Sequence, residues 1–221
     1  MIVHGNEPIT LVGGGSVAES GLRAALRHAP RVVAADSGAD AALAAGVVPE
    51  AVIGDLDSLS NEARARIPGE RVHRIAEQDS TDFDKALRNI EAPLVIGVGF
   101  LGKRLDHQLA ACNTLVRYPG KRAVLTSEDS LVLLSPPNFA LDLARGVTVS
   151  LFPMGAVEGV SEGLEWPIDG LNFAPDGMIG TSNRATGAIQ LGFTAPKMLL
   201  SLPSDCLDGV VASLGRSAAR W

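Results

Sequence analysis

Short apolar runs alternate with amphipathic stretches through the first half of the chain. The runs are rich in Val, Ile, Leu and Ala, and they cover residues 9–12, 31–35, 51–53, 71–75, 94–98 and 122–126. Between them, stretches such as 20–28, 40–45, 81–90 and 105–116 carry apolar residues at helical spacing. This alternation of strands and helices predicts parallel βαβ units.

The pattern changes after about residue 126. Gly and Pro separate short β-rich runs at residues 131–134, 139–143, 147–152, 188–193 and 198–202, and one amphipathic helix is predicted at 207–216. We therefore expect an α/β fold of two domains. A parallel-sheet nucleotide-binding domain spans residues 1–128, and a smaller antiparallel β-sandwich or partial barrel spans residues 129–221.

Polar or glycine-rich clusters follow five of the predicted parallel strands. They are Gly13-Gly14-Gly15, Asp36-Ser37-Gly38, Asp55 with Asp57, residues 78–82, and residues 99–107. The carboxyl ends of parallel strands share one edge of the sheet, and ligands bind in the crevice outside that edge. The five clusters are therefore expected to converge on one site.

Asp55 and Asp57 follow a buried strand with one apolar residue between them. If the chain stays extended there, both carboxylates point to the same side and repel each other by about 4 kcal/mol at ~4 Å. A counter-charge is needed, and Mg²⁺ is the usual one beside phosphates. The alternative is an acidic turn in which Ser58 caps the helix that begins near Asn61.

The stretch from Gln78 to Lys85 is expected to begin a helix. Ser80 or Thr81 can cap it, while Asp82 and Lys85 share its polar face and suit Mg²⁺ and a phosphate respectively. An ordinary amphipathic helix with a solvated ion pair is the alternative.

Arg104 begins the next helix with a planar fork that matches phosphate oxygens. Asp106 can orient Arg104 or contact a metal or substrate. His107 is interpreted as a histidine of the helix start or of the core, and no pattern for covalent catalysis is present.

Composition narrows the class of partner. The net charge of −6 is not offset by any basic stripe, which argues against nucleic acid and against an anionic membrane as partners. Cys112 and Cys206 lie far apart, so no disulfide framework or zinc site is expected, and a cytoplasmic location is predicted.

One rival interpretation rests on the glycine loop. Gly13, Gly15 and Ala18 match G-x-G-x-x-A, and Asp36 follows at the spacing of a dinucleotide fingerprint. This pattern favours an NAD-dependent oxidoreductase, but it leaves the other acids at the site without a role.

Several motifs together resemble those of thiamine pyrophosphokinases. They are G-D-L-D-S at 54–58, Q-D-S-T-D-F-D-K-A-L at 78–87, R-L-D-H at 104–107, G-L-E-W-P-I at 163–168 and G-T-S-N at 180–183. The A-D-S-G-A-D at 35–40 is similar to the family's D-G-G-A-N element. Ser37, Asp40 and Lys103 depart from the family pattern, Lys103 at a position where a second glycine is common.

The resemblance implies transfer of a diphosphoryl group from Mg-ATP to the hydroxyl of thiamine, which gives thiamine diphosphate and AMP. A pterin or another cyclic alcohol is an alternative acceptor. The resemblance also implies a homodimer with the thiamine site at the subunit interface.

The resemblance assigns roles to individual residues. Asp55, Asp57 and Asp82 would hold Mg²⁺, and Asp36, Ser37 and Gly38 would bind ATP. The loop at Gly13, Gly14 and Gly15 is expected to bind ATP from the residues themselves, because backbone N–H groups of a glycine loop after a first strand can face an anion. Gln78, Asp79, Thr81, Lys85, Arg104 and Asp106 would position the triphosphate and the hydroxyl, with Asp79 or Asp106 accepting its proton. Trp166, from the partner subunit, would cover the thiamine rings beside Ser182 and Asn183, although the residues alone also allow a core aromatic at 166.

Overall fold

The computed structural model describes all 221 residues, which divide into two compact units. The first unit comprises residues 1–114 and 123–128, and the second comprises residues 115–122 and 129–221. No helix of the chain combines the length and the apolar composition that a membrane span requires.

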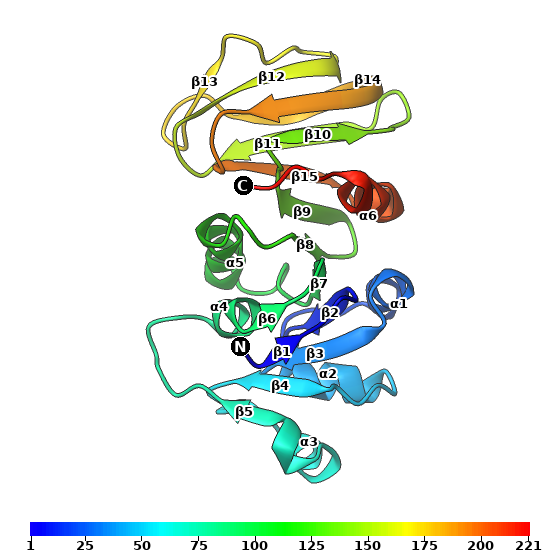
Figure 1. Ribbon diagram of the computed structural model, residues 1–221, viewed down its shortest axis with the longest axis vertical. Helices are drawn as coiled ribbons and strands as arrows, with labels where there is room; N and C mark the ends of the chain where they lie inside the picture. Colours follow the sequence, from blue (N-terminus) through cyan, green and yellow to red (C-terminus); the bar gives the residue numbers. More distant parts are fainter. The chain divides into compact units, whose positions relative to one another are not determined.

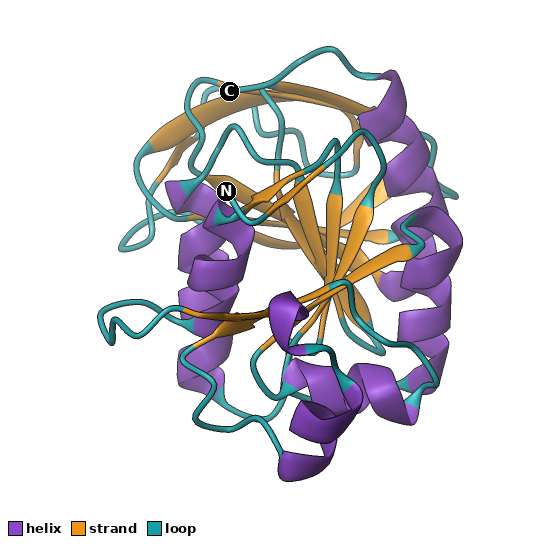
Figure 2. Cartoon of the chain, turned by 60° about the horizontal axis from the view of Figure 1, so that its bottom comes forward, coloured by secondary structure: helices purple, strands orange, loops and turns teal.

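Six parallel strands form the centre of the first unit, in the order β8-β7-β2-β3-β4-β5. Every residue of β2, β4, β7 and β8 is buried, as expected of strands that are covered on both faces. The strands rotate progressively from one to the next (Figure 2). Their bounds are β2 (Ile9–Val12), β3 (Arg31–Ala35), β4 (Ala51–Gly54), β5 (Val72–Arg74), β7 (Val95–Val98) and β8 (Ala123–Thr126).

Helices connect these strands. They are α1 (Glu19–His28), α2 (Gly38–Ala44), α3 (Asn61–Arg66), the 3₁₀ turn η1 (Gly69–Arg71), α4 (Asp82–Arg88) and α5 (Leu105–Arg117). Figure 1 shows α1 and α2 on one side of the strands and α4 on the other. A short parallel pair, β1 (Val3–His4) with β6 (Ile90–Glu91), completes the unit and was not predicted.

The strand order predicts a crevice between the ends of β2 and β7. The chain proceeds from β2 outward to β5 and then returns to β7 on the other side of β2. The loops that follow β2 and β7 therefore leave the sheet toward opposite faces, which is the usual ligand position in such folds.

From the sequence, Leu105, Leu109, Cys112 and Leu115 or Val116 are predicted to form the apolar face of α5, and this prediction is partly wrong. Leu105 and Leu109 are 66% and 59% exposed, whereas Ala111, Thr114 and Leu115 are buried. The buried stripe follows the i, i+3, i+4 spacing of these three residues, and the two leucines lie outside it.

Antiparallel pairing dominates the second unit. Its strands are β9 (Ser130–Leu134), β10 (Asn138–Leu141), β11 (Thr148–Pro153), β12 (Val157–Leu164), β13 (Asn172–Phe173), β14 (Gly180–Phe193) and β15 (Met198–Pro203), followed by the 3₁₀ turn η2 (Ser204–Cys206) and by α6 (Leu207–Arg216). The strand β14 takes part in two ladders. Its first part pairs with β11, and its second part pairs with β12 and β10.

The predicted fold class is confirmed: a domain with a parallel sheet is followed by a smaller, antiparallel β domain. The strand predictions in the second unit were incomplete, and β13 was among the strands not predicted. The strand β12 was missed because Glu, Gly and Ser interrupt its apolar residues, and β14 begins at Gly180 rather than near Ala188.

Candidate functional site

Glycines form one wall of the candidate site, at the loops that follow β2 and β7. The amide of Gly15 donates to the carbonyl of Gly99 at 2.9 Å. A Cβ on Gly15 would lie 2.3 Å from that oxygen, so only glycine permits the two loops to approach so closely. The Phe100 ring fills the space beside Gly13, where a Cβ would lie 2.6 Å from it.

These loops border a cavity of about 250 Å³ in the first unit. It lies where the strand order reverses, as the topology predicts. Backbone, carboxylate and basic groups all face it. The lining residues are Gly14, Gly15, Ala35, Asp36, Ser37, Ser58, Thr81, Asp82, Phe83, Gly99, Phe100, Gly102, Lys103, Arg104 and His107.

The segment from Asp55 to Asp57 is a turn, not the extended strand end that was predicted. Leu56 has φ +66° and is buried, and the amide of Asp57 donates to Oδ1 of Asp55 at 3.3 Å. The left-handed backbone costs a residue such as leucine roughly 1–2 kcal/mol. Burial of the Leu56 side chain among Ala34, Leu43 and Leu59 and a hydrogen bond from Arg64 to the Leu56 carbonyl hold the turn.

Three carboxylates meet at this turn. Asp36, Asp55 and Asp57 each offer an oxygen, and these oxygens lie within 4.8 Å of one another. Asp36 reaches the other two because β3 and β4 are neighbours, paired through Ala35 and Ile53. Asp36 has φ +45°, a strained conformation of the kind that persists at functional sites.

Asp36 also has a buried oxygen without a partner. The residue is 3% exposed; its Oδ2 accepts from the amide of Ser58 at 3.3 Å, while its Oδ1 has no hydrogen bond. Burial raises the pKa of Asp36 to about 6, and the charge of Asp82 adds to that rise. An unpartnered carboxylate oxygen beside two further carboxylates fits a hard divalent cation such as Mg²⁺.

The predicted metal ligands were Asp55, Asp57 and Asp82, but the carboxylate cluster in the structure does not include Asp82. Its Oδ1 lies 3.4 Å from Nζ of Lys85, and Asp36 occupies the third place in the carboxylate cluster. From the sequence, Asp36 is predicted to bind the nucleotide rather than the metal. The register of β3 against β4 was the signal that could have placed it beside Asp55.

Lys85 forms ion pairs with two carboxylates of the protein. It is 1% exposed, and its Nζ lies 3.1 Å from Oδ2 of Asp55 and 3.4 Å from Oδ1 of Asp82. Burial opposes the charge on Lys85, but the hydrogen bond that Lys85 donates to Asp55 and the charge of Asp82 leave the pKa of Lys85 raised. Burial also opposes the charge on Asp55, yet the hydrogen bond from Lys85 helps to hold the pKa of Asp55 below its ordinary value. The counter-charge that the acidic pair needs is therefore built into α4.

The loop before α4 brings further predicted residues to the same edge. Thr81 caps the helix by accepting from the amide of Asp84 at 3.3 Å, and Nε2 of Gln78 donates to Asp55 at 3.3 Å. Asp79 is exposed. The cap of α3 is Ser60, which accepts from the amide of Ala63, so Ser58 does not have the capping role considered for it.

Arg104 and Asp106 form an exposed pair, with Nη2 of Arg104 2.5 Å from Oδ2 of Asp106. The hydrogen bond from Arg104 lowers the pKa of Asp106. Ser37 has ordinary helical dihedrals, and its hydroxyl takes the space that Gly14 leaves free. Asp40 accepts from the amide of Ser60 at 3.4 Å and from its hydroxyl.

In the second unit, the two predicted substrate-binding segments contact each other. The amide of Trp166 donates to Oδ1 of Asn183 at 3.2 Å, and Nδ2 of Asn183 donates to the carbonyl of Trp166 at 2.7 Å. Ser182 has φ +64°, and its amide donates to the hydroxyl of Ser150. The Trp166 side chain is not a core aromatic, because the residue is 55% exposed.

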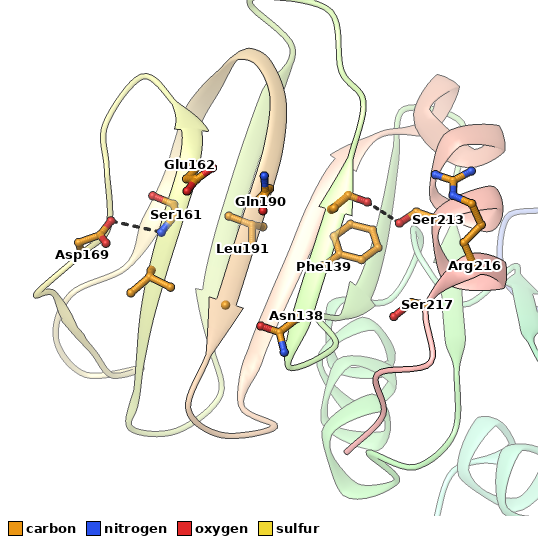
Figure 3. Close-up of a pocket in the computed structure, with 13 residues that line it drawn as sticks. Asn138, Phe139, Ser161, Glu162, Asp169, Gln190, Leu191, Ser213, Arg216 and Ser217 are labelled. Carbon is orange, nitrogen blue, oxygen red and sulfur yellow. Dashed lines mark hydrogen bonds between the residues drawn. The ribbon is translucent and has the colours of Figure 1, made fainter.

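A second cavity, of about 460 Å³, lies on the outer face of β10, β12 and β14 beside α6 (Figure 3). Glu162, Gln190 and Arg216 are among its lining residues, whereas Trp166, Ser182 and Asn183 are not. No sequence motif pointed to this cavity. Because it lacks a carboxylate cluster and a glycine wall, we place the chemistry at the smaller cavity of the first unit.

In comparisons with known proteins, different family models match the first and the second unit. The family described as "Thiamin pyrophosphokinase, catalytic domain" matches residues 22–125, and "Thiamin pyrophosphokinase, vitamin B1 binding domain" matches residues 138–198. Thiamine pyrophosphokinase 1 of Oryza sativa subsp. japonica is 31% identical over 154 residues, and thiamine pyrophosphokinase 1 of Arabidopsis thaliana is 28% identical over the same length. These matches cover 61% of this chain and 58% of each relative.

Solved structures share the fold. Thiamin pyrophosphokinase from Candida albicans has a TM-score of 0.76 at 14% identity, over 91% of this chain and 92% of that one. Thiamin pyrophosphokinase from Geobacillus thermodenitrificans has a TM-score of 0.72 at 23% identity, over 89% of this chain and 96% of that one.

Proposed function

Since the chain belongs to the thiamin pyrophosphokinase family, we propose that it transfers a diphosphoryl group from ATP to the hydroxyl of thiamine. The observation that carries the proposal is the meeting of Asp36, Asp55 and Asp57 beside a glycine-walled cavity. Carboxylate oxygens suit Mg²⁺, and close backbone approach suits a polyphosphate.

Asp55 and Asp57 would hold Mg²⁺ together with Asp36, which replaces Asp82 in the proposed set. Bound there, the metal would neutralise phosphate charge. Lys85 would keep Asp55 ionised and oriented, with Gln78 donating to the same carboxylate oxygen. Thr81 would fix the start of α4, and Asp82 would face the cavity next to Lys85.

The nucleotide would lie against the loops at Gly13–Gly15 and Asp36–Gly38, with Arg104 at the phosphates. The thiamine hydroxyl oxygen would form a bond to the β-phosphorus of ATP. The bond between that phosphorus and the oxygen that bridges it to the α-phosphorus would break, and AMP would leave. Asp106 is paired with Arg104, which lowers its pKa, whereas Asp79 is exposed. We therefore assign the hydroxyl proton to Asp79.

Thiamine would bind through the second unit. The exposed Trp166 ring offers a face to a cationic aromatic ligand, and the hydrogen bonds with Asn183 fix the backbone that carries it. The strained Ser182 lies next to Asn183 on β14.

We further propose a homodimer whose interface includes the thiamine site. Large apolar side chains of the second unit support this proposal, because Phe152, Trp166, Met178 and Ile179 are each at least 40% exposed. Mixing Trp166→Ala with Asp55→Asn protein would test it. If Trp166 acts across the interface, heterodimers regain one intact site and the mixture regains activity.

Two alternatives receive no support. Asp36, which would contact the ribose of NAD in an oxidoreductase, is buried among carboxylates. A pterin acceptor is not favoured by any residue of the second unit, and the relatives carry the name of thiamine enzymes.

Incubation with Mg-ATP and thiamine, followed by nucleotide chromatography, tests the function. AMP and thiamine diphosphate in equal amounts are expected. ADP would indicate transfer of a single phosphoryl group, and the absence of any thiamine-dependent turnover would contradict the proposal.

A further inference from the structure

The basic side chains at the candidate nucleotide cavity differ in what they already bind. Lys85 lies against Asp55 and Asp82, and Arg104 is paired with Asp106. Lys103 also lines the cavity, and its ammonium group has no ion pair or hydrogen bond. Lys103 is therefore the one lysine or arginine lining the cavity whose charge is not already paired with a carboxylate of the protein.

The cavity needs such a group. Asp36 and Asp82 line it, with Asp55 and Asp57 adjoining, and Lys85 is the buried cation among them. A polyphosphate that enters this acidic region requires positive charge beyond the metal ion, because like charges repel strongly where water is partly excluded.

Lys103 is a lysine at a position whose backbone conformation favours glycine. Lys103 has φ +59° and follows Gly102 at φ +90°, so two successive residues adopt the left-handed region. A residue with a Cβ is disfavoured there, and glycine is the residue that the local geometry prefers. A lysine at a position suited to glycine indicates a function for its side chain.

We propose that Lys103 binds the polyphosphate of the nucleotide through its ammonium group, an inference that rests on the proposed function. The flexible stem and compact charge of lysine suit phosphate oxygens without requiring a fixed geometry. This contact belongs to the chain's own sequence, since a glycine at 103 could not make it.

Calorimetric titration of the full chain with Mg-ATP and with Mg-AMP, in the absence of thiamine, tests the proposal. Lys103→Gln removes the charge and keeps the strained backbone, Lys103→Gly removes the charge and relaxes the backbone, and Lys103→Arg keeps the charge. Lys197→Gln, in the second unit, is the matched control.

We expect the Gln and Gly variants to bind Mg-ATP about 5- to 10-fold more weakly, the scale of one charge-assisted contact at a solvated site. Mg-AMP affinity should change less than about twofold, and Lys103→Arg and Lys197→Gln should match the original chain. The thermal midpoint of Lys103→Gly should equal or exceed that of Lys103→Gln.

Three results would overturn the inference. Equal Mg-ATP affinity in Lys103→Gln and the original chain would exclude the contact. If Lys103→Gln binds Mg-AMP as much more weakly as it binds Mg-ATP, the effect belongs to the nucleoside end of the ligand. If Lys103→Gly binds Mg-ATP normally while Lys103→Gln does not, the effect belongs to the backbone. If the original chain fails to bind Mg-ATP, the proposed function fails with it, and this outcome is distinct from the other three.

Discussion

The two units hold their candidate residues in different ways. In the first unit, Asp36 and Lys85 are buried, and Lys85 is held to Asp55 by an ion pair. In the second unit, Trp166 and Asn183 are joined through main-chain hydrogen bonds, and the Trp166 ring remains exposed. A site built from buried charges resists rearrangement, whereas an exposed ring on a fixed backbone can adapt to a ligand or a partner. The comparison predicts that substitutions in the first unit affect stability and chemistry, and that those in the second affect affinity.

The largest effect is expected from Lys85→Met. It leaves Asp55 and Asp82 without their buried partner, and loss of one partner of a buried pair costs about 3–5 kcal/mol. Denaturant unfolding should show this loss in the free energy of unfolding, while Lys197→Met should change it little. A Lys85→Met protein of unchanged stability would contradict the account of a site held by charge.

Asp55→Asn should affect turnover next most strongly. The amide retains the shape and can still accept from Lys85, but it removes one charge of the carboxylate cluster. We expect kcat to fall roughly 10²–10³-fold, the usual result of losing one preorganised electrostatic contact. Asp142→Asn, an exposed position in the second unit, is the control. Full activity of Asp55→Asn, or of the original chain in excess chelator, would remove the metal role.

Asp36 predicts a pH dependence in metal-free buffer. Its pKa is raised from 3.8 to about 6, so between those values the folded chain binds more protons than the unfolded chain. Stability should therefore fall as pH rises from about 4 to 6, by about 3 kcal/mol in total. Asp36→Asn should lack this component, and the difference between the two unfolding curves against pH measures it. Parallel curves would show that Asp36 does not titrate as proposed.

Trp166→Ala should have the smallest of these effects and should act on one substrate. Loss of a stacking and cation–π surface should raise the KM for thiamine about tenfold or more and leave the KM for ATP nearly unchanged. Because the side chain is exposed, the thermal midpoint should hardly move. Equal changes in the KM for thiamine and the KM for ATP would contradict the assignment of thiamine binding to the second unit and ATP binding to the first.

Much of the first unit could be predicted from its sequence because a parallel sheet collects the strand ends at one edge. The glycine loop, the Asp55–Asp57 pair and the Thr81 cap all follow from that rule and from local spacing. Local spacing could not show that Lys85 turns inward to Asp55, which lies thirty residues earlier. It also could not give the left-handed backbone of Leu56, which depends on the packing of that side chain in the core.

The second unit was harder to predict for a physical reason. Antiparallel strands pair across variable loops, so spacing alone does not show which segments meet. The contact between Trp166 and Asn183 joins two motifs whose proximity only pairing explains. In β12, Glu, Gly and Ser interrupt the apolar residues, and near its end Gly163, at φ +77°, accompanies an irregularity in the pairing with β14.

The double pairing of β14 has a consequence for local opening of the second unit. Residues near Ser182 and Asn183 pair with β11, while the same strand continues into the ladders with β12 and β10. Because both ladders share one continuous strand, we expect its amides to exchange with solvent hydrogen as one cooperative segment. A molecule held at Ser182 and Asn183 would then slow exchange along all of β14, including amides that it never touches.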